Sequence, residues 1–411
     1  MRKIVIVGGE LSSSVFSRWY RIFNQRNKIT IITDTQYPAF YRSVLPLIVS
    51  GDIGVKEALA FTPQYLSLFS DIILVKDVRE VKVDEKMVTL GTGDEIEYDK
   101  LIIASGTSPL IEGYPLRNIE EAVKLRDIIK DKDKVVKIYG GLQGLWAGEV
   151  LSSKGFNVEV FTDPSTGFYR EYFDDDIWNF ALKIAEHKFK LTDKRLTKCD
   201  NSLKIIYGYE KARLPTLNIE LPLREGILTD NLMRVNENVY ALGSVSQPKD
   251  EIFGHRFVPI SDYVTAVQGV IAALSMFERN VRGVLQSFSL KIGKIYLFSA
   301  GYTKSKAERY GIKVATTRLA VPLKDVISGD GKVKVYVKAI GDRERGRLIG
   351  VQIIGPYEAL ILGSYAYSLI LWRSTIDSFM SLVSPYIPGE IFNINPVLKS
   401  LHALWRKTLE F

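Results

Sequence analysis

The stretch that decides the fold lies at the N-terminus, where residues 2–9 read RKIVIVGG. A short run of β-branched residues that stops at two glycines predicts a buried strand followed by a tight turn. The next segment, Leu11–Asn24, spaces its apolar residues along one helical face, and Ile29–Ile32 predicts a second strand. A strand, turn, helix and strand within about thirty residues predict the start of a doubly wound parallel sheet.

The same pattern recurs further along the chain. Val135–Ile138 predicts a strand, and the glycine-rich stretch 140–144 predicts a turn. Leu145–Lys154 then predicts a helix, and Val158–Phe161 a second strand. A chain of 411 residues is long enough for two or three domains. The two units therefore predict two nucleotide-binding-type domains.

Three further regions complete the predicted organisation. Ile96–Pro109 predicts one buried strand that ends in a tight turn, and Val239–Ser244 predicts a strand that enters a glycine turn. Asp262–Glu278 has the spacing of a helix. From about Ser289 onward the pattern changes to alternating strands, such as 332–340 and 347–354, followed by helical segments.

Composition excludes several classes of site. One cysteine excludes an intrachain disulfide framework, a multi-cysteine zinc site and a CxxC redox pair. Three scattered histidines argue against a histidine-rich metal site. The net charge of +8 favours anionic ligands, but no basic cluster is interleaved with aromatic residues, so we expect no nucleic-acid partner.

The sequence also predicts no membrane span. The longest uncharged apolar stretch, Ala359–Trp372, has 14 residues, which is too short to cross a bilayer. The N-terminus has the pattern of a strand and lacks that of a secretion signal, so we expect a cytoplasmic protein.

Taken in order, these segments resemble the FAD-dependent pyridine nucleotide-disulfide oxidoreductase family. Within it they are most similar to the branch of coenzyme A-disulfide reductases, NADH oxidases and NADH peroxidases. The most specific match is Glu97–Pro109, EYDKLIIASGTSP, which is similar to the family's YDxLIxATGxxP turn. Ala39–Pro46 is similar to the segment that carries the branch's redox cysteine, and Ser384–Val397 resembles the tail of the family's dimerisation domain.

The resemblance implies an α/β fold with two doubly wound, Rossmann-like nucleotide-binding domains, the second inserted in the first, plus a C-terminal α+β dimerisation domain. We place the FAD-type domain at residues 1–112 and 225–285, the inserted NAD(P)H-type domain at 113–224, and the dimerisation domain at 286–411. The implied cofactors are FAD and either NADH or NADPH. The implied partners are a small-molecule or nucleotide ligand and a second copy of the chain.

Candidate cofactor-binding residues follow from the same resemblance. No metal ligand is predicted, and no catalytic residue is assigned, because Ser43 stands where the redox cysteine would be. The FAD-type candidates are Gly8, Gly9, Glu10, Asp34, Arg42, Ala104, Ser105, Gly106, Gly243 and Ser244, and the NAD(P)H-type candidates are Gly140, Gly141 and Gly144.

The FAD-type motifs depart from the family pattern. The second and third glycines of the dinucleotide fingerprint are Glu10 and Ser13, and the acid expected at the end of the second strand is Thr33, with Asp34 one residue later. The family's Gly-Asp is completed by Ser244. A carboxylate about 4 Å from a phosphate costs roughly 4 kcal/mol at an effective dielectric near 20. These losses, applied in full, would leave FAD weakly bound.

The second unit and the redox position depart as well. The first fingerprint position is Tyr139, and the family's helix glutamate is Trp146. We interpret Ser43 as structural, since serine cannot cycle through a disulfide, and Cys199 as a lone thiol. Tyr386 is either an interface aromatic or a residue that reaches the partner subunit's site.

Two hypotheses about function follow. In the first, the protein is an FAD-dependent NAD(P)H oxidoreductase that works without the redox cysteine, so that the cofactor carries the chemistry. In the second, it is a flavin-free relative, a dimeric nucleotide-binding or scaffold protein. The fold does not separate them, because function depends on the site.

Overall fold

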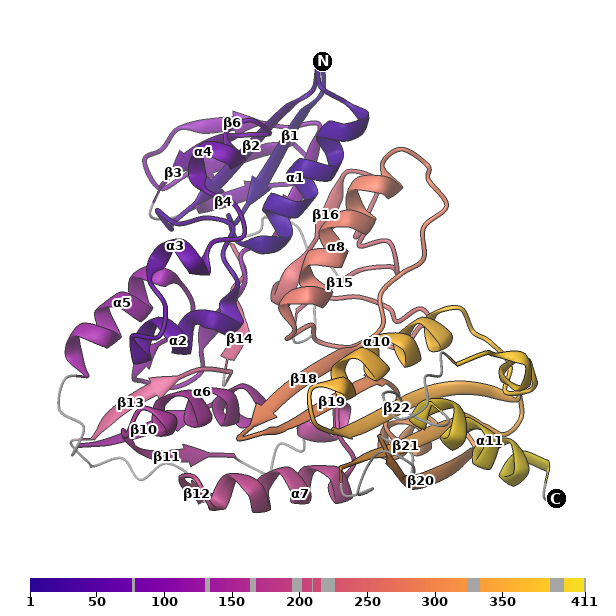
Figure 1. The fold of residues 1–411 in the computed structure, drawn as a ribbon. Coiled ribbons are helices and arrows are strands. Elements are labelled where there is room, and N and C mark those ends of the chain that lie inside the picture. The colour runs from indigo at the N-terminus through magenta and orange to yellow at the C-terminus, as the bar shows by residue number, and fades with distance from the viewer. Residues whose placement is uncertain are drawn as a thin grey trace. The chain divides into compact units, whose positions relative to one another are not determined.

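The computed structural model describes residues 1–75, 78–129, 134–162, 168–193, 202–208, 210–215, 226–323, 333–384 and 395–409. The chain divides into two compact units (Figure 1). The N-terminal unit comprises Met1–Thr162 and Arg195–Val284, and the C-terminal unit comprises Asp163–Lys194 and Leu285–Phe411. Segment 163–194, which we assigned to the inserted domain, groups with the C-terminal residues in this division, and our domain boundaries stay a prediction.

The N-terminal unit contains a parallel sheet in the order β16-β7-β1-β2-β3. The central strand β1 places Ile4 opposite Ile29 of β2 and Lys100 of β7. Its apolar residues are almost fully buried, as a β-branched run predicts for a strand covered on both faces. The strands are β1 (Lys3–Val7), β2 (Lys28–Thr33), β3 (Asp71–Leu74), β7 (Lys100–Ile103) and β16 (Val239–Ala241).

Two helices pack against each other in this unit, α1 (Leu11–Phe23) and α8 (Asp262–Ser275) (Figure 1). Phe16 of α1 belongs to the same buried cluster as Ile271 of α8. A Cβ atom at Gly269 would lie 2.4 Å from the backbone oxygen of Ser12. Glycine at this position therefore sets how closely the two helices approach.

The prediction of one continuous strand between Ile96 and Pro109 is wrong. The segment forms β6 (Glu95–Glu97), β7 and β8 (Thr107–Pro109), with a break after β6. At that break the Tyr98 amide donates to the carbonyl of Lys86, and the Asp99 carboxylate accepts the Lys3 amide at 2.6 Å. β6 joins the antiparallel sheet β4-β5-β6, whose other strands are β4 (Val78–Lys82) and β5 (Met87–Leu90).

The inserted part has its own parallel strands, in the order β11-β10-β13-β9. Helix α6 starts at Gly141, four residues earlier than predicted, because the glycine-rich stretch is its first turn and Gly144 donates to the Gly140 carbonyl at 3.1 Å. β8 pairs antiparallel with β14. The elements are β9 (Tyr114–Pro115), α5 (Ile119–Ile128), β10 (Val135–Tyr139), α6 (Gly141–Ser153), β11 (Asn157–Phe161), β13 (Leu203–Ile206) and β14 (Glu210–Ala212).

Short elements complete the N-terminal unit. The most important for the site is the 3-10 turn η1 (Arg42–Val44), which leads directly into α2 (Leu45–Ser50). The others are α3 (Val55–Ala58), α4 (Pro63–Leu66), β15 (Ile227–Leu228), η4 (Gly243–Val245) and β17 (Ser246–Gln247).

The C-terminal unit contains an antiparallel sheet in the order β18-β19-β22-β21-β20. Helix α10 packs on β19 and β22, and α11 packs on β20 and β21. The elements are η3 (Phe168–Glu171), α7 (Asp175–Glu186), β12 (Lys190–Thr192), β18 (Ser287–Ile292), β19 (Ile295–Gly301), α9 (Lys304–Arg309), β20 (Val314–Pro322), β21 (Lys334–Asp342), β22 (Arg347–Gly355), α10 (Glu358–Leu371), η5 (Asp377–Ser381) and α11 (Pro396–Leu409).

A buried ion cluster joins segment 168–193 to this sheet. Lys338 of β21 is 1% exposed and contacts the carboxylates of Asp174 and Asp176, each at 2.7 Å. Burial works to raise the pKa of Asp174, but the Lys338 ammonium and the Ser305 amide outweigh it and hold that pKa below its usual range. A paired charge at this depth is costly to break, so the cluster fixes the segment in place within its unit.

The predicted fold class is confirmed: a doubly wound sheet interrupted by a second parallel sheet, followed by an α+β unit. The apolar stretch Ala359–Trp372 forms most of α10, whose Leu362 and Ile370 are buried. Among the described residues, no helix is long and apolar enough to cross a membrane.

The contact between α1 and α8 gives a test of the fold. We expect Gly269→Ala to lower the free energy of unfolding by about 1–3 kcal/mol, because overpacking outweighs the roughly 1 kcal/mol that alanine contributes to a helix. Thermal unfolding followed by circular dichroism measures the effect. Tyr263→Ala, in the exposed first turn of the same helix, is the control with little expected change. An unchanged or higher midpoint for Gly269→Ala would contradict this packing.

Candidate nucleotide-binding site

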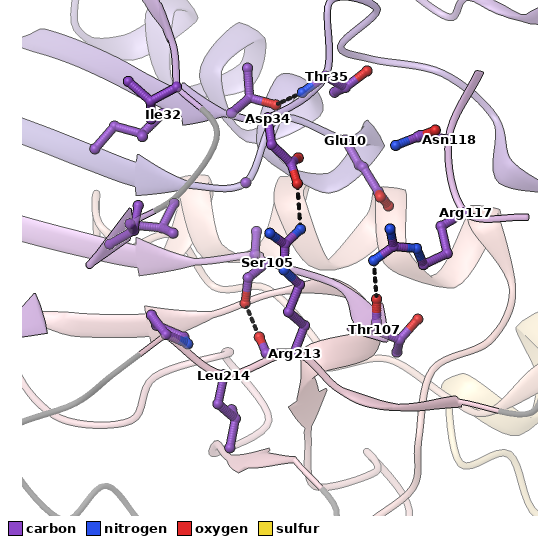
Figure 2. A pocket seen from close by; sticks show the side chains of 18 of the residues that line it. Glu10, Ile32, Asp34, Thr35, Ser105, Thr107, Arg117, Asn118, Arg213 and Leu214 are labelled. Atoms are coloured by element: carbon purple, nitrogen blue, oxygen red, sulfur yellow. Dashed lines mark hydrogen bonds and ion pairs between the residues drawn. The ribbon is translucent and has the colours of Figure 1, made fainter. Parts of the chain in front are cut away.

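A cavity of about 530 Å³ lies in the N-terminal unit, at the carboxyl ends of β1, β2 and β7 (Figure 2). Ligands of doubly wound sheets bind at this edge. Five segments contribute most of the lining. They are Gly8–Glu10 after β1, Thr33–Thr35 at the end of β2, the residues Ala104, Ser105 and Thr107 after Ile103 of β7, Arg117–Asn118 before α5, and Arg213–Pro215 after β14.

The first two glycines of the turn after β1 are required by the fold itself. Gly8 has φ +111°, and a Cβ atom there would lie 2.1 Å from the carbonyl oxygen of Ala104. A Cβ atom at Gly9 would lie 2.6 Å from the hydroxyl oxygen of Thr33. These glycines let the turn pass between two strand ends, so their presence does not by itself indicate a ligand.

Glu10 places a carboxylate in the cavity. It is the N-cap residue of α1, but its side chain makes no capping hydrogen bond and has no partner in the part of the chain that the structure describes. Its carboxylate oxygens lie 3.6 and 3.9 Å from the position a Cβ atom would take at Gly106. The space that Gly106 leaves open is therefore occupied by the chain's own carboxylate.

The surroundings of Glu10 favour its neutral form. Burial raises the pKa of the Glu10 carboxyl to about 7, and the Asp262, Asp34 and Glu210 carboxylates add to the rise, while the Arg42 guanidinium opposes it. The neutral form is therefore favoured well above the pH at which an ordinary carboxyl group ionises.

Asp34 is neutralised by Arg213. The two form an ion pair at 2.5 Å. The Arg213 amide donates to the Gly106 carbonyl at 2.9 Å, and the Ser105 hydroxyl donates to the Arg213 carbonyl. The segment after β14 is thereby tied to the turn after β7, and the acid at the end of β2 is not free to receive a ribose.

Two more guanidinium groups line the cavity. Arg117 pairs with Glu121 and lies within 3.5 Å of the Thr107 carbonyl oxygen. Arg79 is exposed and has no side-chain partner among the described residues. In Figure 2 the Glu10 carboxylate points into the cavity, with the Asp34–Arg213 pair on one side and Arg117 on the other. The three guanidinium groups outnumber the two carboxylates, so the lining favours an anion.

Ser43, at the redox position, is exposed and is held by hydrogen bonds to its backbone. The Ser43 amide donates to the Asp262 carboxylate at 2.8 Å, and its carbonyl accepts the Trp146 indole N–H at 2.7 Å. Burial raises the pKa of Asp262, opposed by the hydrogen bonds from Ser43. The two bonds fix this turn relative to α8 and α6.

Arg42, next to Ser43, belongs to a buried cluster beside the cavity. Its guanidinium pairs with Glu210, donates to the Thr107 hydroxyl at 3.1 Å, and lies 5.7 Å from the centre of the Tyr207 ring. The side chains of Arg42 and Glu210 are 13% and 4% exposed. Arg42 is therefore engaged within the protein.

The remaining predicted residues lie away from the cavity lining. A Cβ atom at Gly140 would lie 1.7 Å from the Tyr207 carbonyl oxygen, and one at Gly144 would contact Val160 at 3.4 Å, so both serve packing. A Cβ atom at Gly141, which has φ +52° at the start of α6, would lie 3.9 Å from the Thr162 carbonyl oxygen, an ordinary contact. The Gly243 amide donates to the Gln268 side chain at 2.8 Å, and Ser244 follows in η4.

The structure thus gathers part of the predicted set. Those in the lining are Gly8, Gly9, Glu10, Asp34, Ala104 and Ser105, and Arg42, Gly106, Gly243 and Ser244 are outside it. Arg79, Arg117 and Arg213 were not predicted, and no local pattern marks them. Cys199 and Tyr386 lie outside the described residues, and among the described ones no cluster of side chains could hold a metal ion.

The cavity lining covers only part of the positions that a whole FAD molecule would need. It omits Ser43, Gly243 and Ser244, which the resemblance assigns to the flavin side. The Glu10 carboxylate lies over Gly106, at the position that the sequence assigns to a diphosphate. The lining therefore has the extent of a compact nucleotide, with Glu10 beside the expected position of its phosphates.

Comparisons with known proteins place the chain among flavin- and nicotinamide-type folds. A family model described as pyridine nucleotide-disulphide oxidoreductase matches residues 2–189, and a model of its dimerisation domain matches residues 290–387. An NAD(P)H sulfur oxidoreductase (CoA-dependent) of Pyrococcus abyssi is 24% identical over 94% of this chain and 95% of that protein. An NADH oxidase of Methanocaldococcus jannaschii is 25% identical over 86% of this chain and 88% of that protein.

A solved structure shows the same fold. Reduced CoADR-RHD of Bacillus anthracis aligns with a TM-score of 0.87 at 18% identity, covering 99% of this chain and 80% of that chain. The shared fold extends across both units, while the residues at the cavity are a property of this sequence.

The raised pKa of Glu10 predicts a pH-dependent stability. A carboxyl whose pKa rises on folding stabilises the protein while protonated, and this contribution is lost as pH increases from the ordinary value of 4.5 through about 7. We expect Glu10→Gln to leave the melting temperature nearly unchanged at pH 5 and to raise it at pH 8. The exposed residue Glu112 supplies the control variant Glu112→Gln. Equal effects of Glu10→Gln at both pH values would contradict the assignment.

Proposed function

Because the chain belongs to the pyridine nucleotide-disulphide oxidoreductase family, we propose that it is a flavin-free member that binds an adenine nucleotide in the cavity after β1. The observation that carries the proposal is the extent of the cavity: its lining includes Gly8–Glu10 and Asp34 but omits Ser43, Gly243 and Ser244. The omitted positions are those that the family resemblance assigns to the flavin half of a dinucleotide site.

The cavity supports an adenine nucleotide by position and charge. It lies at the edge of a doubly wound sheet, where such folds bind nucleotides. Arg79, Arg117 and Arg213 offer guanidinium groups to phosphate, for which their planar donors are suited. Of the three, Arg79 is exposed and has no competing side-chain partner among the described residues, so it is the group best placed to gain a phosphate.

Thiol chemistry is not part of the proposal. A serine hydroxyl cannot form the disulfide through which the redox cysteine of this branch cycles. The single cysteine of the sequence, Cys199, lies outside the described residues, and no redox role is assigned to it.

A second candidate function is an FAD-dependent NAD(P)H oxidoreductase without the redox cysteine. Two observations favour it: the glycine turn at Gly141, at the start of a 13-residue helix, and relatives named as NAD(P)H sulfur oxidoreductase and NADH oxidase. For this function, the flavin end of FAD would have to bind outside the cavity lining, beside the exposed residue Ser43.

Calorimetry with three ligands separates the candidates. We expect ADP to bind, nicotinamide mononucleotide not to bind, and FAD to bind no more tightly than ADP, because the cavity lining omits Ser43, Gly243 and Ser244. Arg79→Ala should weaken ADP binding about 10- to 150-fold, the loss of one charged hydrogen bond. Arg26→Ala, an exposed arginine of the same unit outside the lining, is the matched control. FAD that binds much more tightly than ADP would favour the oxidoreductase instead.

We also propose a homodimer formed through the region that matches the family's dimerisation domain, residues 290–387. Ile361 of α10 and Trp372 just after it are 60% and 64% exposed, a high cost for large apolar side chains in water. Light scattering should give twice the chain mass of 46.4 kDa. Ile361→Asp with Trp372→Asp should give the monomer, whereas Leu68→Asp, at an exposed apolar residue of the N-terminal unit, should not. A monomeric wild type at micromolar concentration would contradict the proposal.

A further inference from the structure

Glu10 is a carboxylate without a hydrogen-bond partner among the described residues, set in a cavity whose lining otherwise favours anions. It stands at the N-terminus of the 13-residue helix α1, where the helix dipole and free amides favour negative charge. A nucleotide phosphate in the cavity competes with this carboxylate for the same region.

Charged groups of both signs surround Glu10. Three carboxylates raise its pKa: Asp34 after β2, Glu210 of β14 and Asp262 of α8. One cation, Arg42 of η1, lowers it. Arg117 and Arg213 line the same cavity. Arg117 is paired with Glu121, and Arg213 is paired with Asp34. Glu120 of α5 accepts a hydrogen bond from the Thr35 hydroxyl at 2.9 Å. An added phosphate therefore meets two guanidinium groups that are already paired and one, Arg79, that has no side-chain partner among the described residues.

We propose that the cavity binds its nucleotide together with a proton, which is taken up by the carboxylate of Glu10. This inference rests on the proposed nucleotide binding and adds how that binding is regulated. The neutral carboxylic acid has an O–H donor, so it can hydrogen-bond a phosphate oxygen that the carboxylate would repel.

The burial of Glu10 places this exchange near neutral pH. Since the pKa of the free protein's Glu10 is about 7, binding at pH 6 meets a carboxyl that is mostly protonated already. Above pH 7 the nucleotide must draw a proton from solvent, and linkage requires its affinity to fall as pH rises, by up to tenfold per pH unit for one proton.

Calorimetry with ADP from pH 7.5 to 9 tests the inference, because ADP's phosphates are fully ionised in that range. We expect the dissociation constant of the wild type for ADP to rise about tenfold per pH unit. The number of protons taken up is obtained by comparing the binding heats in two buffers of different ionisation enthalpy, and it should approach one per ADP. Glu10→Gln should bind ADP with little pH dependence and without proton uptake, and Glu112→Gln should behave as the wild type.

A second readout separates proton uptake from a structural effect. The infrared difference spectrum on adding ADP should show a new protonated carboxyl band in the wild type, and that band should be absent in Glu10→Gln. ADP binding to the wild type with no pH dependence and no proton uptake would overturn the inference and leave the proposed function intact. No ADP binding by either protein at any pH would overturn both. Binding by Glu10→Gln alone would overturn the inference and leave the proposed function intact, because the wild type would then fail to bind ADP even with Glu10 protonated.

Discussion

The segment Arg42–Val44 is held between two helices by hydrogen bonds to its own backbone. The Ser43 amide donates to Asp262 at the start of α8, and the Ser43 carbonyl accepts from Trp146 in α6. Each bond occupies space beside the residue that stands at the redox position. The buried Arg42–Glu210 pair fixes the same turn from its other side. The cavity after β1 lies in the same unit, and its charge determines which ligands fit.

The cavity keeps the architecture of a nucleotide site and changes its electrostatics. Gly8 and Gly9 are needed by strand packing, so they persist whether or not a dinucleotide binds. Glu10 takes the space above Gly106, and Asp34 is neutralised by Arg213. A site built in this way discriminates by charge and protonation, because two of its three guanidinium groups are paired and its one unpaired carboxylate changes charge near neutral pH.

The sequence was a good guide to the elements and a partial guide to the site. β1, α1 and α8 follow from apolar periodicity and glycine turns, which are local signals. The start of α6 was missed because glycine lowers helix propensity, although it is tolerated at a helix N-terminus. Arg213 could not be predicted, because it reaches the cavity through the pairing of β14 with β8. The Ser43–Asp262 bond joins residues 219 apart in sequence, a contact that only the tertiary fold creates.

The most direct test of the flavin-free proposal is the visible absorption spectrum of the protein as purified, and again after incubation with excess FAD and removal of the unbound flavin. Because the cavity lining omits Ser43, Gly243 and Ser244, neither sample should show the absorption bands of bound flavin between 350 and 500 nm. One equivalent of flavin per chain in either sample would contradict the proposal and favour an FAD-dependent oxidoreductase.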